Sequence, residues 1–221
     1  MRIIFEEVFM VFSSMVFLWI FLPVVFVLSF LIRKPKYQNI LLLAASLLFY
    51  AWGEPRNIIL LLVSIFLNWV FGLLIDRCRE RGKLFLTLDI LVNLGLLGYF
   101  KYTDFFINTI NHVVPGAAIP LANIALPIGI SFFTFQAMSY VIDLYRGQIK
   151  VQKNLLYLAL YVSFFPQLIA GPIVKYRDIE VQIENRRATM AGISTGFRRF
   201  VYGLGKKVLI SNLIAQAADN L

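Results

Sequence analysis

The segment from Leu126 to Asp178 constrains the fold more than any other part of the chain, because it is strongly apolar and yet carries helix breakers and polar side chains. Pro127 and Gly129 open its first apolar run, and Pro166 falls inside its second. An unpaired polar group in hydrocarbon is costly, so irregular backbone at membrane depth must be buried in protein or line a wet cavity. The segment therefore predicts the wall of a cavity inside a membrane protein.

Composition agrees with a membrane protein. Of the 221 residues, 60% are hydrophobic and 15% are charged, whereas a soluble domain is roughly half apolar and about a quarter charged. The net charge of +9 comes from Lys and Arg placed between apolar runs. This placement favours a role in membrane topology and contact with lipid headgroups over nucleic-acid binding. We therefore expect an all-α polytopic membrane protein that forms a single domain over residues 1–221.

Four membrane spans are predicted within residues 15–100, each an apolar run bounded by charged residues: 15–32, 37–53, 57–75 and 84–100. The loops 33–36 and 77–83 are basic and are separated by two spans, so they lie on the same side. The positive-inside rule places both loops in the cytoplasm and the N-terminus outside.

Residues 105–174 are expected to form broken helices around a cavity. Prolines limit this part to a short outer helix at 105–114, a helix from about 127 to 145, and a kinked or re-entrant helix within 154–174. Residues 175–221 alternate basic and apolar side chains, which predicts amphipathic helices at the membrane interface. The uncharged run near the C-terminus is too short to cross a bilayer, so we expect a truncated fold.

The chain resembles a known family in several stretches. LPIGISFFTFQAMSYVIDLYRG (126–147), FFPQLIAGPIVKYRD (164–178), LLFYAWGEP (47–55) and NLGLLGYFKYTDFF (93–106) are similar to membrane-bound O-acyltransferases of the bacterial alginate O-acetyltransferase type. The resemblance covers nearly the whole chain in order. Because relatives often begin at the equivalent of Met10, it also implies that residues 1–9 are an extension.

The resemblance implies a function as well as a fold. It implies transfer of an acyl group, most simply acetyl, from acetyl-CoA or another activated donor in the cytoplasm to a hydroxyl of an extracytoplasmic polysaccharide. No bound cofactor is implied, and a protein outside the membrane receives the acyl group in some relatives. The family's catalytic histidine is expected beyond Leu221, so this chain would be the N-terminal part and inactive alone.

The residues themselves show no complete catalytic set. The one histidine, His112, lies at the end of the predicted outer helix, where an interfacial position is the simpler interpretation. The one cysteine, Cys78, lies on a basic loop. We find no metal-ligand cluster, nucleophile elbow or phosphate-binding loop. No residue of this chain is therefore assigned to catalysis or to a metal.

Polar residues in the constraining segment are the candidates for the lining of a substrate channel. Gln136, Tyr140 and Asp143 are spaced four and three apart and so share one helix face. The other candidates are Tyr145, Arg146, Gln167, Gly171 and Pro172. The competing and favoured interpretation is a structural cluster that ties helices together, with Asp143 paired to Arg146.

Two further alternatives stay open. Asp89 is an intramembrane acid and so a functional suspect, although extension of its side chain towards Lys83 is the simpler explanation. At the level of function, the alternative to an acyltransferase is a non-catalytic membrane scaffold, or one half of a split acyltransferase. This alternative is supported by the lack, in this chain, of a residue that matches the family's catalytic histidine.

Overall fold

The computed structural model describes residues 14–114, 119–168, 173–186, 188–211, 214, 215 and 218, and these residues form helices and no strand. The predicted all-α fold class is confirmed for this part of the chain. The candidates Gly171 and Pro172, and the suggested extension at residues 1–9, lie outside the described residues.

The four predicted spans correspond to helices, with bounds within a few residues of the expected ones. They are η1 (Phe17–Phe21) continued by α2 (Leu22–Leu31), α3 (Pro35–Gly53), α4 (Ile58–Arg77) and α5 (Gly82–Leu97). Two stretches of the described residues are long and apolar enough to cross a membrane, Ile58–Arg77 and Arg79–Val113. The apolar run Phe17–Leu31 is shorter.

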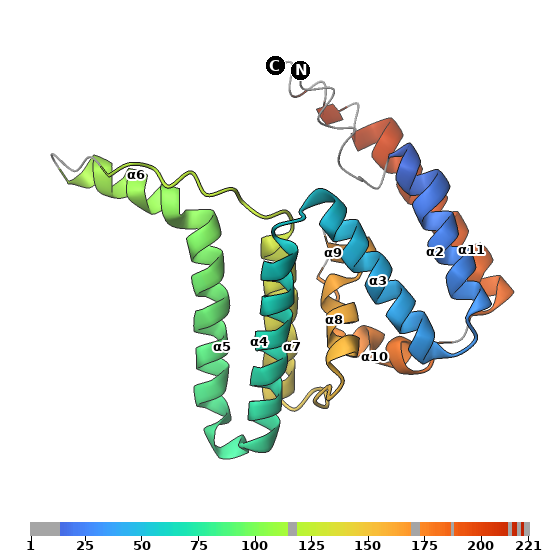
Figure 1. The fold of residues 1–221 in the computed structure, drawn as a ribbon, viewed down its shortest axis with the longest axis horizontal. Helices are drawn as coiled ribbons and strands as arrows, with labels where there is room; N and C mark the ends of the chain where they lie inside the picture. Colours follow the sequence, from blue (N-terminus) through green and yellow to red (C-terminus); the bar gives the residue numbers. More distant parts are fainter. Residues whose placement is uncertain are drawn as a thin grey trace.

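The second half of the chain alternates long and short helices. After α5 the chain bends through η3 (Gly98–Tyr102) into α6 (Thr103–Val113), which turns aside across the upper end of α5 (Figure 1). The remaining elements are α7 (Ile130–Tyr145), α8 (Leu155–Ser163), α9 (Phe165–Leu168), α10 (Tyr176–Glu184), α11 (Met190–Gly205) and η4 (Lys206–Ser211). α11 runs alongside α2 (Figure 1). The interfacial position expected for residues 175–221 stays a prediction.

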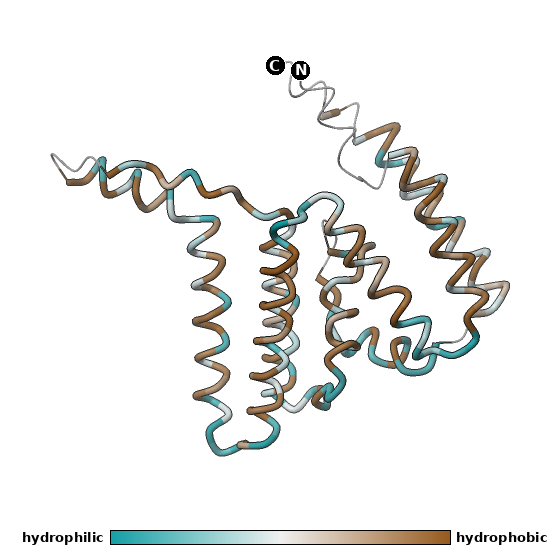
Figure 2. Tube along the Cα trace, viewed as in Figure 1, coloured by the Kyte–Doolittle hydropathy of each residue, from teal (hydrophilic) through white to brown (hydrophobic). Residues whose placement is uncertain are grey.

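Charged loops gather at one end of the bundle. The α4–α5 loop, the loop after α7 and the start of α3 all lie at the lower end in Figure 1. Figure 2 shows the same ends as hydrophilic and the helix middles as mostly hydrophobic. Loops 33–36 and 77–83 therefore lie at the same end of the bundle (Figure 1). Their location on one side of the membrane stays a prediction.

A pair of asparagines joins α4 to α5 inside the bundle. Asn68 and Asn93 exchange hydrogen bonds between their side-chain amides, at 3.1 and 3.2 Å. Each amide also donates to a carbonyl one turn earlier on its own helix. Such pairs satisfy polar groups that would otherwise be stranded in an apolar environment. They fix the register of the two antiparallel helices.

Asp89 does not extend towards Lys83. Its side chain is fully buried and neither carboxylate oxygen has a hydrogen-bond partner among the described residues. The explanation preferred from the sequence is therefore wrong. The residue lies on the face of α5 that also carries Asn93, because a spacing of four places both on one side of a helix.

Helix α7 begins later than expected and ends as expected. Gly129 has a left-handed backbone (φ +77°), so the helix begins at Ile130 rather than near Pro127. At its other end Gly147 (φ +72°) allows its own N–H to reach Leu144 O and the next N–H to reach Asp143 O, at 3.0 and 2.9 Å. This pair of bonds is the Schellman arrangement that a C-terminal glycine permits.

A glycine lets α4 and α7 approach closely. A Cβ atom added at Gly72 would lie 3.2 and 3.3 Å from the Cε1 and hydroxyl oxygen of Tyr140. The Tyr140 side chain is fully buried and its hydroxyl accepts a hydrogen bond from Gln152 N, so it has little room to move. Close packing at this point therefore requires glycine.

We predict that Gly72→Ala lowers the free energy of unfolding by about 1–3 kcal/mol through overpacking. Gly95→Ala is the matched control, because the added Cβ would meet nothing within 4 Å. Alanine there should be neutral or stabilising by up to about 1 kcal/mol. Unfolding of the full-length protein in mixed micelles measures both. Equal effects of the two substitutions would contradict the close α4–α7 contact.

Candidate functional site: a broken re-entrant helix

The break between α8 and α9 is the local feature around which the site is built. Pro166 has no N–H to donate to the carbonyl of Val162, and its ring would clash with that carbonyl in a continuous helix. The chain leaves helical geometry at Phe164 (φ −55°, ψ 114°) and resumes a short helix at Phe165. The predicted kink of the second apolar run is confirmed.

The break releases two main-chain groups that a continuous helix would have joined, and side chains from other helices satisfy both. The N–H of Phe165 donates to Ser46 Oγ of α3 at 3.1 Å. The carbonyl of Tyr161 accepts from Gln136 Nε2 of α7 at 2.9 Å and from Gln167 Nε2 of α9 at 2.7 Å. Buried main-chain groups must be paired, so these three side chains hold the break in place.

The segment enters and leaves the bundle at the same end. Gln152, just before α8, donates from Nε2 to the hydroxyl of Tyr176, the first residue of α10, at 2.8 Å. The Tyr161 hydroxyl donates to Val174 O at 2.9 Å. These two bonds join the ascending and returning parts of the segment. The two limbs therefore return to the same end of the bundle. Entry and exit on one side of the membrane stays a prediction.

Three tyrosines form the contact between the re-entrant segment and α7. The ring of Tyr176 meets the rings of Tyr140 and Tyr161 edge to face, with centroids 5.3 and 5.2 Å apart. All three side chains are fully buried. Their hydroxyls bond to Gln152 and Val174, so each large ring is buried with its polar end satisfied.

The candidates on α7 lie in this contact. Gln136 and Tyr140 are 3% and 0% exposed and both bond to the main chain of the re-entrant segment or the loop before it. Their contacts support the structural interpretation, in which they tie helices together. A role in lining a channel stays a prediction for them.

The predicted ion pair between Asp143 and Arg146 is wrong. Asp143 is 5% exposed and one of its carboxylate oxygens has no partner, whereas Arg146 is exposed. The cation at this helix end is Arg79, which comes from the α4–α5 loop. Its guanidinium donates to Leu144 O and Tyr145 O at 3.3 and 2.8 Å, and it lies over the Tyr145 ring. A cation favours the C-terminal end of a helix dipole.

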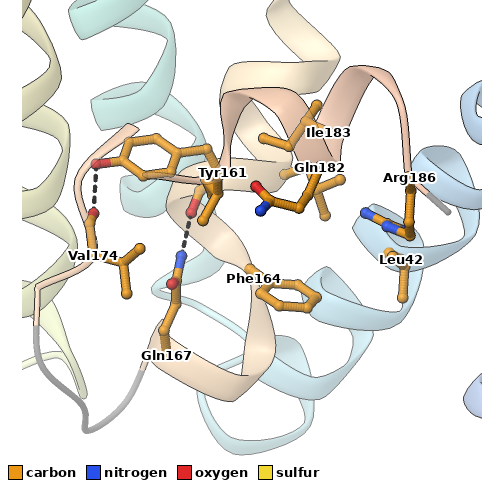
Figure 3. A pocket seen from close by; sticks show the side chains of 10 residues that line it. Leu42, Tyr161, Phe164, Gln167, Val174, Gln182, Ile183 and Arg186 are labelled. Atoms are coloured by element: carbon orange, nitrogen blue, oxygen red, sulfur yellow. Dashed lines mark hydrogen bonds between the residues drawn. The ribbon is translucent and has the colours of Figure 1, made fainter. Parts of the chain in front are cut away.

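A pocket of about 390 Å³ adjoins the break (Figure 3). Helices α3, α8 and α10 surround it, and Gln167 is the sequence candidate that lines it. Its walls are mostly apolar, and they consist of Leu42, Leu160, Tyr161, Phe164, Gln167, Val174, Ile179, Gln182, Ile183 and Arg186. Sequence spacing could not identify this set, because Leu42 comes from α3 and the other residues from the distant stretch 160–186.

The described residues contain no group of three or more His, Cys, Asp or Glu side chains placed to hold a metal ion. His112 lies on α6, at the opposite end of the bundle from the basic loops (Figure 1). It is exposed, and its Nδ1 lies 2.7 Å from Asn108 O of the same helix. The interfacial interpretation of His112 is consistent with this position.

Comparison with known proteins agrees with the resemblance seen in the sequence. The model of the membrane-bound O-acyltransferase family matches residues 148–221, which include the re-entrant segment. A probable alginate O-acetylase of Pseudomonas syringae pv. tomato is 41% identical over 217 residues, or 96% of this chain. The chain therefore resembles the membrane-bound O-acyltransferase family.

Other relatives extend the comparison. The probable alginate O-acetylase of Pseudomonas aeruginosa is also 41% identical, and a peptidoglycan O-acetyltransferase of Helicobacter pylori is 34% identical over 95% of this chain. The chain spans 42% of the length of both Pseudomonas proteins and 46% of the Helicobacter protein. No solved structure matches the chain.

The bonds at the break give a direct test. Ser46→Ala should lower the free energy of unfolding by about 1–3 kcal/mol, because it leaves the buried N–H of Phe165 without an acceptor. Ser163→Ala is the matched control: it is equally buried, but its hydroxyl bonds only to Ala159 O of its own helix. Ser163→Ala should change the free energy of unfolding by no more than about 0.5 kcal/mol. Equal losses in mixed-micelle unfolding would show that Ser46 does not support the break.

Proposed function

We propose that this chain is part of a membrane O-acetyltransferase that modifies a hydroxyl of a polysaccharide outside the cytoplasm. The match of residues 148–221 to the family model supports the proposal, as do relatives described as a probable alginate O-acetylase and a peptidoglycan O-acetyltransferase. The observation that carries it is the re-entrant α8–α9 segment. A helix that only anchored the protein would need no such break, nor three side chains to satisfy it.

The reaction joins the acetyl carbonyl carbon to the acceptor oxygen. The hydroxyl oxygen attacks the thioester carbonyl of acetyl-CoA, the carbon–sulfur bond breaks, and the hydroxyl proton passes to a base while the sulfur leaves as a thiol. We propose that the base is a histidine outside this chain, because His112 is exposed on α6 and faces its own helix carbonyl.

Residues of this chain would act by positioning. Helices α8 and α9 would form the floor of the cavity in which donor and acceptor meet. This floor must stay fixed, because small displacements of reacting groups lower reaction rates strongly. The two glutamines that bond to Tyr161 O would fix that floor relative to α7 and α9. Both are positioning residues, since neither is placed against a reacting atom.

The arrangement in the membrane follows from charge. We propose that the basic end of the bundle faces the cytoplasm of a bacterial inner membrane, and that α6 and the N-terminus lie outside. An activated acetyl donor would then approach from the end that carries Arg79 and Lys153. The acceptor polysaccharide, or an acyl-accepting protein, would approach from the end that carries α6.

The test uses membranes that contain the full-length protein and acetyl-CoA labelled in the acetyl group. We expect base-labile label in polysaccharide or in an extracytoplasmic protein. Gln167→Leu should lower the rate about tenfold, as expected for a loss near 1.4 kcal/mol. Gln148→Leu should not, because Gln148 is exposed and its main-chain N–H, which its side chain does not affect, makes the bond to Asp143 O.

Two outcomes would count against the proposal. Absence of label with abundant folded protein would favour the non-catalytic scaffold. Equal rates for Gln167→Leu and the unaltered protein would be compatible with acetyl transfer. They would show that the position of α8 and α9, as held by Gln167, does not affect its rate.

A further inference from the structure

The pocket beside the break has a charged end as well as apolar walls. Its volume of about 390 Å³ lies in the range of small-molecule sites, roughly 300–1,000 Å³. Six apolar side chains make up most of the lining, and Arg186 supplies the one formal charge among the lining residues. Figure 3 shows Arg186 at one side of the pocket, next to Leu42, with Phe164 and Gln167 further in.

The Arg186 guanidinium is not neutralised by the described residues. Its Nη2 donates to Asn39 Oδ1 at 3.3 Å, and Asn39 in turn donates to Ile183 O at 2.7 Å. The ion pair found among the described residues is Arg177–Asp178, at the other end of α10. Burial lowers the pKa of Arg186, because desolvation disfavours the charged form. A half-buried cation without an anion is a site that an anion would stabilise.

The charged and apolar ends of the pocket are ordered along the axis of α3. Asn39, which bonds to Arg186, lies in the second turn of α3, near the basic end of the bundle. Ser46, which bonds to the break, is seven residues further along α3, or about 10 Å deeper. Leu42 lies between them and lines the pocket. The positive charge therefore lies at the basic end of the bundle, and the apolar walls extend from it towards the break.

From this order we propose that the pocket binds one anionic phospholipid of the leaflet at the basic end. Its phosphate pairs with Arg186, and an acyl chain lies against Leu42 and Phe164. A guanidinium matches the geometry of a phosphate, and the leaflet next to basic loops is rich in anionic lipid. The site does not depend on the proposed acetyl transfer, because it uses neither a donor nor an acceptor.

The experiment measures lipid binding to the full-length protein. Delipidated protein is titrated with phosphatidylglycerol or with phosphatidylcholine, and the number of lipids retained is counted by native mass spectrometry. We expect one tightly retained phosphatidylglycerol. Arg186→Gln should weaken its binding about tenfold, equivalent to 1.4 kcal/mol. Arg186→Lys should keep most of the affinity, because it keeps the charge.

Arg177→Gln is the matched control, since Arg177 lies near the start of α10, is exposed and is already paired with Asp178. It should leave phosphatidylglycerol binding unchanged. Equal weakening by the two substitutions would reduce the effect to general surface charge and overturn the proposal. Unchanged binding in Arg186→Gln would also overturn it. Binding of inorganic phosphate alone as tightly as phosphatidylglycerol would show that the acyl chain contributes nothing, and would overturn the proposal.

Discussion

The carbonyl oxygen of Tyr161 is the point on which the re-entrant segment depends. Pro166 forbids a continuous helix, so this carbonyl loses its helical partner inside an apolar bundle. Gln136 and Gln167 replace the lost donor, and Ser46 accepts the N–H that would have filled the position. Without these bonds the break would leave two buried main-chain groups unpaired, at about 1–3 kcal/mol each.

The same bonds connect the consecutive helices α8 and α9 to α3 and α7, which are distant in sequence. Ser46 belongs to α3, Gln136 to α7, and Gln167 to α9, while the carbonyl belongs to α8. The tyrosine contact extends this connection to α10, and Gln152 connects it to α4 through Trp69 Nε1 at 3.1 Å. A break that is held from several sides stays rigid, and rigidity is what a site that aligns two substrates requires.

Hydropathy and breakers predicted much of the fold. Long apolar runs located α3, α4 and α5, because a helix that crosses hydrocarbon must hide its main chain and present apolar side chains. Pro166 located the break and Gly147 located the end of α7, since each restricts the backbone locally. The grouping of the basic loops followed from the count of spans alone.

Partners across the fold were not predictable from spacing. Asp143 and Arg146 have the right separation for an ion pair, yet one faces the bundle and the other faces out. Arg79 takes the expected place of the cation from a loop more than sixty positions away in the chain. Ser46 gave no local signal, because a serine in an apolar helix most often bonds only to its own preceding turn. Its second bond exists only once α3 and α8 are packed.

The central claim is that residues 152–176 enter and leave at one side of the membrane, and cysteine labelling tests it most directly. In the full-length protein, Lys153→Cys and Lys175→Cys should react with an impermeant maleimide from the same side as native Cys78, all three positions being exposed. Arg56→Cys, in the α3–α4 turn, should react only from the other side. Labelling of positions 153 and 175 from opposite sides would show that the segment spans the membrane and would contradict the account.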